Sequence, residues 1–113
     1  MKTPFRKSNH ASVLARDLTA ARDYYKTVME LELLDSTDEQ LVFKTGDSLF
    51  YVIHDPDRSG TVLEFYVDDL DAARDRLVSK SCRVIKWEGK GKDCYMQDPF
   101  GMIFNLWEEN VEK

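Results

Sequence analysis

The chain has 113 residues, enough for one domain with a hydrophobic core but too few for two independent domains. Hydrophobic residues make up 42% of the chain and charged residues 33%, a balance typical of folded proteins, which argues against disorder. The formal net charge of -5 disfavours contact with a phosphate backbone, so we expect no nucleic-acid partner.

The first half of the chain predicts a strand, a helix and three more strands. Asn9 to Arg16 forms the first strand, and Asp17 is placed to cap a helix that runs from about Leu18 to about Met29. Strands are expected next at residues 32–35, 40–45 and 48–54, with turn residues between them. A polar connector at residues 55–60 ends this half.

The second half repeats this order. A strand at residues 61–68 precedes a helix that Asp69 is placed to cap and that runs from about Leu70 to about Ser79. Three strands follow at residues 83–87, 93–97 and 102–107. The segments that begin at Asp17 and Asp69 are offset by 52 residues and agree at six of seven positions, which indicates an internal repeat.

The repeat predicts an α+β fold, in which two βαβββ modules form a curled mixed sheet. We expect a single domain over residues 1–113, with a first module at about 8–54, a linker at 55–60 and a second module at about 61–108. Each module alone is too small to bury both faces of its sheet, so the two are expected to pack together.

Strand alternation separates a face that packs on the helix from a face that lines a cleft. In the first strand, the small residues Ala11, Val13 and Ala15 suit the helix side, which leaves His10 and Ser12 on the other face. On the strand at residues 61–68, the same reasoning puts Leu63, Phe65 and Val67 toward the helix. The polar and aromatic residues that it assigns to the cleft side include Tyr51, Glu64, Tyr66, Asn105 and Trp107.

The ordered motifs resemble the vicinal oxygen chelate superfamily, which includes glyoxalase I, extradiol dioxygenases, and fosfomycin- and bleomycin-resistance proteins. Three segments carry the resemblance: residues 10–17, 62–69 and 98–106, the last of which starts with Asp98-Pro-Phe-Gly101. The resemblance implies an open, barrel-like cleft that a second copy often completes in chains of this length. Because closed two-fold dimers are also the commonest oligomers, we expect a homodimer.

The resemblance also implies a divalent metal with one ligand from each of four strands. The matching positions here are His10, Val62, Asn105 and a residue near Tyr51. Val62 has no donor atom, and Asn105 offers a neutral oxygen where the family usually has Glu. We therefore predict no metal and no other cofactor, with Glu64 as the candidate replacement ligand if a metal binds after all.

Three functions remain open on this basis. The first is a small-molecule-binding protein of the glyoxalase/bleomycin-resistance type, without a metal. The second is a metal-dependent glyoxalase-like lyase or isomerase, or a dioxygenase, so the residues leave open whether the chain is an enzyme. The third is an interaction domain whose cleft has lost its function.

The predicted site residues fall into two groups. His10 and Glu64 are the candidate catalytic residues, since an imidazole can transfer protons near neutral pH and a partly desolvated carboxylate can act as a base or a cation anchor. They lie on equivalent strands, so we expect them to face a shared cleft. The candidate ligand-binding residues are Ser12, Tyr51, Tyr66, Asn105 and Trp107.

The sequence also indicates in which compartment of the cell the protein is expected. The first residues contain no apolar stretch typical of a secretory signal, and the longest strongly apolar run, Leu49 to Ile53, is too short to span a bilayer. Cys82 and Cys94 do not form a CxxC motif and are expected to be reduced. We therefore expect a cytoplasmic protein without a membrane partner.

Overall fold

The computed structural model describes residues 5–109 and divides into two units. The first unit is residues 9–62, and the second, within the described part of the chain, is residues 5–8 and 63–109. The boundaries fall inside two strands, β1 (Arg6–Ala15) and β5 (Gly60–Val67). The first residues of β1 therefore belong to the second unit.

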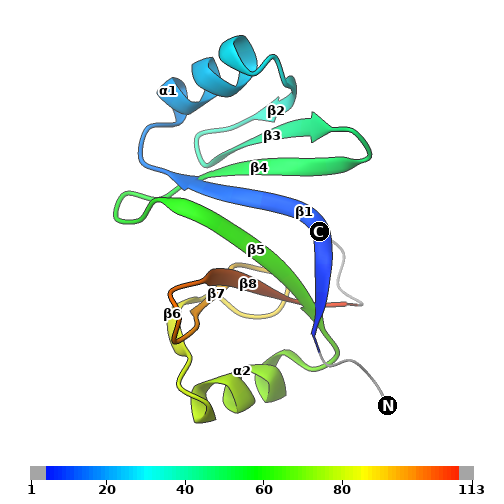
Figure 1. Cartoon of the computed structure of the whole chain (residues 1–113), viewed down its shortest axis with the longest axis vertical. Helices are drawn as coiled ribbons and strands as arrows, with labels where there is room; N and C mark the ends of the chain where they lie inside the picture. Colours follow the sequence, from blue (N-terminus) through cyan, green and yellow to red (C-terminus); the bar gives the residue numbers. More distant parts are fainter. Residues whose placement is uncertain (1–4, 110–113) are drawn as a thin grey trace. The chain divides into compact units, whose positions relative to one another are not determined.

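The first unit is a mixed sheet with one helix against it (Figure 1). After β1 come α1 (Leu18–Asp23), the π-helical turn η1 (Tyr24–Val28), β2 (Glu32–Ser36), β3 (Gln40–Thr45) and β4 (Ser48–His54). The strand order is β2-β3-β4-β1. Strand β4 is antiparallel to β3 and parallel to β1, which makes the sheet mixed.

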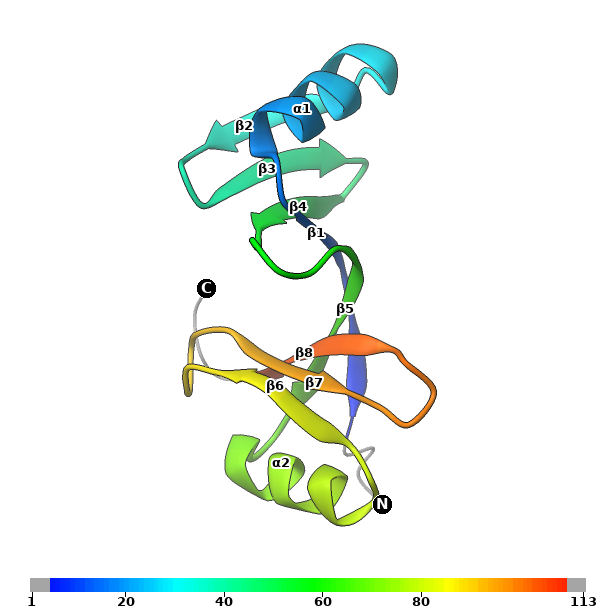
Figure 2. The same cartoon turned by 90° about the vertical axis from the view of Figure 1, so that its left-hand side faces the viewer.

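The second unit has the same succession of elements. After β5 come α2 (Leu70–Ser79), β6 (Arg83–Trp87), β7 (Cys94–Gln97) and β8 (Ile103–Glu108), with the strand order β5-β8-β7-β6. Figure 2 shows α2 beside these strands, and the helix contacts β6 and β8. The predicted α+β fold is confirmed, and α2, β3, β4 and β6 have their predicted bounds. No helix of residues 5–109 is long and apolar enough to cross a membrane.

The first helix differs from the prediction of a continuous α-helix up to about Met29. The α-helix ends at Asp23, and a wider turn follows, in which the Met29 N–H donates to the carbonyl of Tyr24 at 3.2 Å. The Leu31 N–H then donates to the carbonyl of Tyr25 at 3.0 Å, around Glu30 at a φ of 55°. This left-handed end is a common way to close a helix, although glycine is its usual residue.

Both helices begin at the predicted aspartates. A side-chain oxygen of Asp17 accepts the N–H of Ala20 at 3.0 Å, and a side-chain oxygen of Asp69 accepts the N–H of Ala72 at the same distance. Each bond satisfies one of the backbone donors that the first turn of a helix leaves without a partner.

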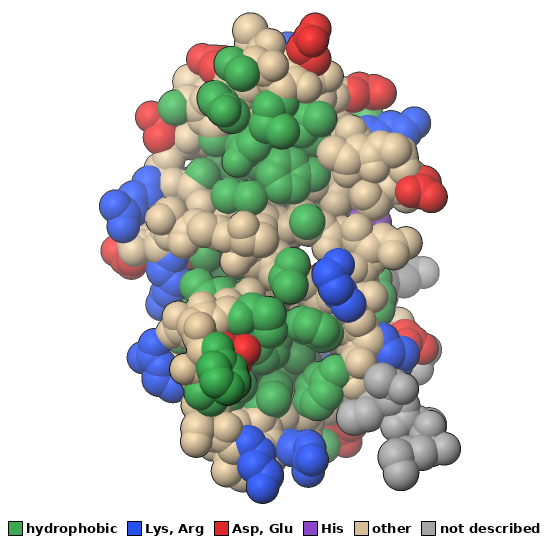
Figure 3. All heavy atoms as spheres, viewed as in Figure 1, with side chains coloured by type: hydrophobic (Ala, Val, Ile, Leu, Met, Phe, Trp, Pro, Cys, Tyr) green, Lys and Arg blue, Asp and Glu red, His purple; other side chains and the backbone are tan. Residues whose placement is uncertain are grey.

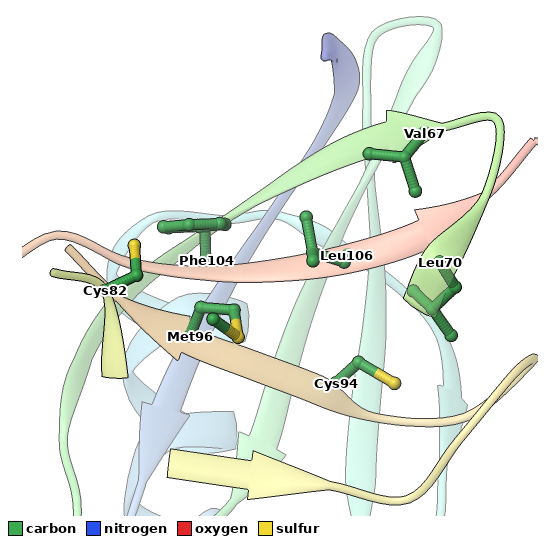
Figure 4. Packing of buried hydrophobic residues seen from close by; sticks show 7 residues of the cluster. All are labelled: Val67, Leu70, Cys82, Cys94, Met96, Phe104 and Leu106. Carbon is green, nitrogen blue, oxygen red and sulfur yellow. The ribbon is translucent and has the colours of Figure 1, made fainter. Parts of the chain in front are cut away.

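Each unit has its own hydrophobic core. In the first, Tyr25 stacks edge-on against Phe43 and Phe50, with ring centroids 6.0 and 5.1 Å apart. In the second, seven buried residues pack together (Figure 4): Val67, Leu70, Cys82, Cys94, Met96, Phe104 and Leu106. Leu63 and Phe65 pack against this cluster, so the residues of β5 that were expected to face the helix do so.

The start of β1 is tied to the second unit by ion pairs. The guanidinium of Arg6 donates to a carboxylate oxygen of Asp68 at 3.0 Å and to one of Glu109 at 2.8 Å. The three side chains are between about a third and a half exposed, so water and salt screen these pairs and they contribute little to stability. They fix where the strand begins more than they stabilise the fold.

Replacing Asp69 by Ala tests the cap of α2. The substitution leaves the Ala72 N–H without its acceptor and is expected to lower the free energy of unfolding by about 1 kcal/mol, measured by urea denaturation. Asp75→Ala is the control, because Asp75 lies on the same helix and only forms an exposed pair with Arg74. Equal unfolding midpoints for the two variants would show that the cap contributes nothing measurable.

Candidate functional site

Three of the predicted site residues lie together in the first unit. Ser12 on β1 is directly opposite Tyr51 on β4 in the parallel pair. The rings of His10 and Tyr51 meet edge-on, with centroids 6.0 Å apart and planes at 89°. All three side chains are half-buried. The neighbouring strands β1 and β4 therefore present an imidazole, a hydroxyl and a phenol close together, on the face that turns away from α1.

His10 uses one ring nitrogen to hold the backbone of the neighbouring strand. The N–H of Leu49 donates to Nδ1 of His10 at 3.0 Å. An imidazole nitrogen that accepts a hydrogen bond carries no proton, so the neutral ring is the tautomer protonated on Nε2. Protonating Nδ1 would break this bond, and a metal ion on Nδ1 would do the same.

The other four predicted residues lie on strands of the second unit. Glu64 and Tyr66 alternate along β5 with residues that pack on the core, so they are on the opposite face of the strand. The same alternation on β8 places Asn105 and Trp107 away from the core cluster. Trp107 is 9% exposed, and the other three are half-buried.

Asn105 is also bonded to the backbone. Its Oδ1 accepts the N–H of Cys94 at 2.8 Å, from the beginning of the neighbouring strand β7. The bond is partly buried, and it gives the Cys94 N–H an acceptor that this donor would otherwise lack. The amide oxygen is therefore part of the connection between β7 and β8.

Two residues of this face were not predicted as site residues. Tyr95 lies opposite Asn105 and is only 1% exposed, and Lys86 on β6 lies opposite Tyr95 with its ammonium 5.5 Å from the ring centroid. Lys86 also pairs with Asp93 at 3.1 Å. Alternation along residues 94–97 could have identified Tyr95, because Cys94 and Met96 belong to the core side.

The seven predicted residues therefore fall into two sets. His10, Ser12 and Tyr51 belong to the first unit, while Glu64, Tyr66, Asn105 and Trp107 belong to the second. A cleft shared by His10 and Glu64 would join the two sets, and it stays a prediction.

The residues at the family's metal positions do not fit a divalent ion. Val62 is 1% exposed and has no donor atom, and Asn105 Oδ1 is bonded to a backbone N–H. Nδ1 of His10 likewise accepts a backbone N–H, that of Leu49. Within residues 5–109, no three His, Cys, Asp or Glu side chains gather closely enough to hold a metal. The donors that zinc or magnesium requires are thus not assembled at these positions.

The two cysteines are structural thiols. Burial raises the pKa of the Cys82 thiol and also that of the Cys94 thiol, whose Sγ donates to the carbonyl of Gly89 at 3.2 Å. Neither thiol forms a disulfide, and both stay protonated at neutral pH. A nucleophilic cysteine needs a lowered pKa, so neither residue fits that role.

Asn105→Ala tests the role of the amide. The variant leaves the Cys94 N–H without an acceptor and is expected to lose about 1–3 kcal/mol of stability in urea denaturation, with faster hydrogen exchange at that N–H. Asn105→Asp keeps an oxygen at the same place and is expected to retain most of the protection. An alanine variant as stable and as protected as the wild type would contradict this role.

Known structures share the fold at low sequence identity. The hypothetical protein BH1468 from Bacillus halodurans C-125 has 10% identity and a TM-score of 0.64, over 96% of this chain and 98% of that chain. A variant of homoprotocatechuate 2,3-dioxygenase from B. fuscum has 18% identity and a TM-score of 0.65, over 94% of this chain. The chain spans 33% of that dioxygenase.

A third match is a variant of methylmalonyl-CoA epimerase from Streptomyces coelicolor, in complex with 2-nitronate-propionyl-CoA. It has 17% identity and a TM-score of 0.61, over 98% of this chain and 99% of that chain. No curated protein matches the sequence. A family model described as Glyoxalase/Bleomycin resistance protein/Dioxygenase superfamily matches residues 7–106. The chain belongs to this superfamily.

Proposed function

We propose that this protein binds a small molecule without the help of a resident metal, in the manner of the bleomycin-resistance type of its superfamily. One observation carries the proposal. Of the positions where metal ligands are expected, Val62 has no donor, and the donor atoms Nδ1 of His10 and Oδ1 of Asn105 accept backbone N–H groups. A metal at Nδ1 would have to displace the bond that joins β1 to β4, and Oδ1 of Asn105, which keeps a second lone pair, would offer only a neutral oxygen that is already bonded to β7.

The face of the second unit away from its core offers groups for ligand recognition. Glu64 supplies a carboxylate, and Tyr66 and Trp107 supply aromatic surface on the same side of their strands. Binding sites usually combine apolar walls with a few polar anchors, and aromatic rings also attract cations. This combination favours a planar ligand that carries a basic nitrogen.

The alternative function is a metal-dependent enzyme that uses His10 and Glu64. Its support is that two of the similar folds belong to enzymes, a dioxygenase and an epimerase, at 18% and 17% identity. At such identities the likeness extends to the fold alone. In this alternative Glu64 replaces the missing ligand at Val62, so the metal content of the protein separates the two functions.

The expected homodimer also remains a proposal. Figure 3 shows hydrophobic side chains gathered on the visible face of each unit. Eight large hydrophobic residues are exposed among those described: Tyr24, Val28, Met29, Leu34, Val78, Val84, Phe100 and Met102. Exposed apolar side chains that gather in patches favour contact with another protein surface.

Elemental analysis of gently purified protein tests the proposal directly. We expect no stoichiometric zinc, nickel, iron or manganese, because the donors required by such ions are absent or bonded to the backbone. About one such ion per chain would overturn the proposal and favour the enzyme, and its loss in a Glu64→Gln variant would identify the replacement ligand.

Glu64→Gln tests ligand recognition with the shape of the side chain preserved. Proflavine, a planar cationic dye, serves as the probe in a fluorescence titration. The variant is expected to lose about 1–3 kcal/mol of affinity, the usual contribution of a hydrogen bond to a charged group. Its fold should persist, because Leu63, Phe65 and Val67 still pack on the core.

Glu32→Gln is the matched control for this titration. Glu32 is an exposed glutamate on β2, in the other unit, and its replacement makes the same change of net charge. It should leave the affinity for proflavine unchanged. Equal affinities of the Glu64→Gln variant and the wild type for proflavine would show that the carboxylate takes no part in ligand recognition.

A further inference from the structure

A polar pocket lies within the first unit, between α1 and the connection from β2 to β3. Its volume is about 290 Å³, and it is larger than the apolar pockets of about 210 and 190 Å³ in the second unit. None of the predicted site residues lines it. Its lining residues are Leu18, Thr19, Arg22, Ser36, Thr37, Asp38 and Leu41.

Arg22 is the cation of this pocket. Its side chain is half-buried, and no carboxylate of residues 5–109 lies within ion-pair distance of it. By contrast, Arg6 and Arg74 each pair with two carboxylates. An arginine that stays without a carboxylate partner in a chain of net charge -5 is available to bind an anion from solution.

Hydroxyl groups add further hydrogen-bond donors to the same pocket. Thr19 on α1 and Ser36 at the end of β2 both line it. The third hydroxyl, of Thr37, has a structural role, since it accepts the N–H groups of Glu39 and Gln40 at 3.1 Å and shapes the turn. The turn thereby holds Ser36 and Asp38 at the pocket's edge, opposite the helix.

We propose that this pocket binds the phosphate group of a small phosphorylated compound. A guanidinium offers several N–H donors in a planar fork, and two hydroxyls add donors in other directions, which suits the oxygens of a tetrahedral phosphate better than the two of a carboxylate. The volume exceeds that of a phosphate group alone. Leu18 and Leu41 supply an apolar wall for the organic part, and the carboxylate of Asp38 can accept a hydrogen bond from a hydroxyl of that part.

A titration with inorganic phosphate, followed in ¹H–¹⁵N spectra at constant ionic strength, tests the proposal. We expect saturable chemical-shift changes at the amides of residues 18–22 and 36–41. A titration with chloride should not produce these changes. Arg22→Gln should weaken the binding about tenfold or more, because a hydrogen bond to a charged group is lost. Its fold should persist, since Arg22 makes no ion pair with a described residue.

Lys26→Gln is the matched control, because Lys26 follows Arg22 by four residues, is exposed and does not line the pocket. It removes the same charge and should leave the affinity unchanged. Shifts scattered over the surface, or equal losses in the two variants, would show only general attraction of anions and would overturn the proposal.

Glycerol 3-phosphate tests the second half of the inference. It should bind more tightly than inorganic phosphate, because its hydroxyls reach Asp38 and its carbon chain contacts the two leucines. Equal or weaker binding would contradict a site for an organic phosphate. Neither titration depends on Glu64 or on metal content, so failure here leaves the proposed ligand-binding function untouched.

Discussion

Each unit packs one helix against one face of its sheet, and this constraint decides the environment of almost every strand residue. Because side chains alternate along a strand, burying one set against the helix turns the next set to the opposite face. On β8, Phe104 enters the core and Asn105 is directed away from it. The functional candidates are therefore the residues left over once the helix-facing set has been assigned.

The residues on that opposite face also serve the sheet itself. Asn105 accepts a backbone N–H from β7, and His10 accepts one from β4, so both side chains act as links between neighbouring strands. The single lone pair of His10 Nδ1 is used in its bond, and Asn105 Oδ1, although it keeps a second lone pair, is a neutral oxygen that already holds a backbone N–H. The chain thus keeps the fold of its superfamily while positions that could hold a metal support the backbone. Binding without a metal needs none of these atoms, which is why we favour it.

Much of the fold follows from local sequence signals, whereas the site does so only in part. The two aspartate caps, the internal repeat and the bounds of α2 were predictable because each depends on nearby residues. The π-helical turn after Asp23 could not be predicted in this way. Its hydrogen bond spans five residues, where an α-helix spans four, and no glycine in the sequence marks the change. The bonds made by His10 and Asn105 connect residues 39 and 11 positions apart, and no local pattern encodes them. For the same reason Lys86 was overlooked beside Tyr95.

The most direct test of this account is the tautomer of the His10 ring and its response to a metal, read from its ¹⁵N resonances. We predict that the neutral ring carries its proton on Nε2 and that the Nδ1 resonance, shifted as that of a hydrogen-bond acceptor, is unchanged by equimolar Zn²⁺. His54, an exposed residue at the end of β4, serves as the internal reference. A ring protonated on Nδ1, or a zinc-induced shift at His10 without one at His54, would contradict the account.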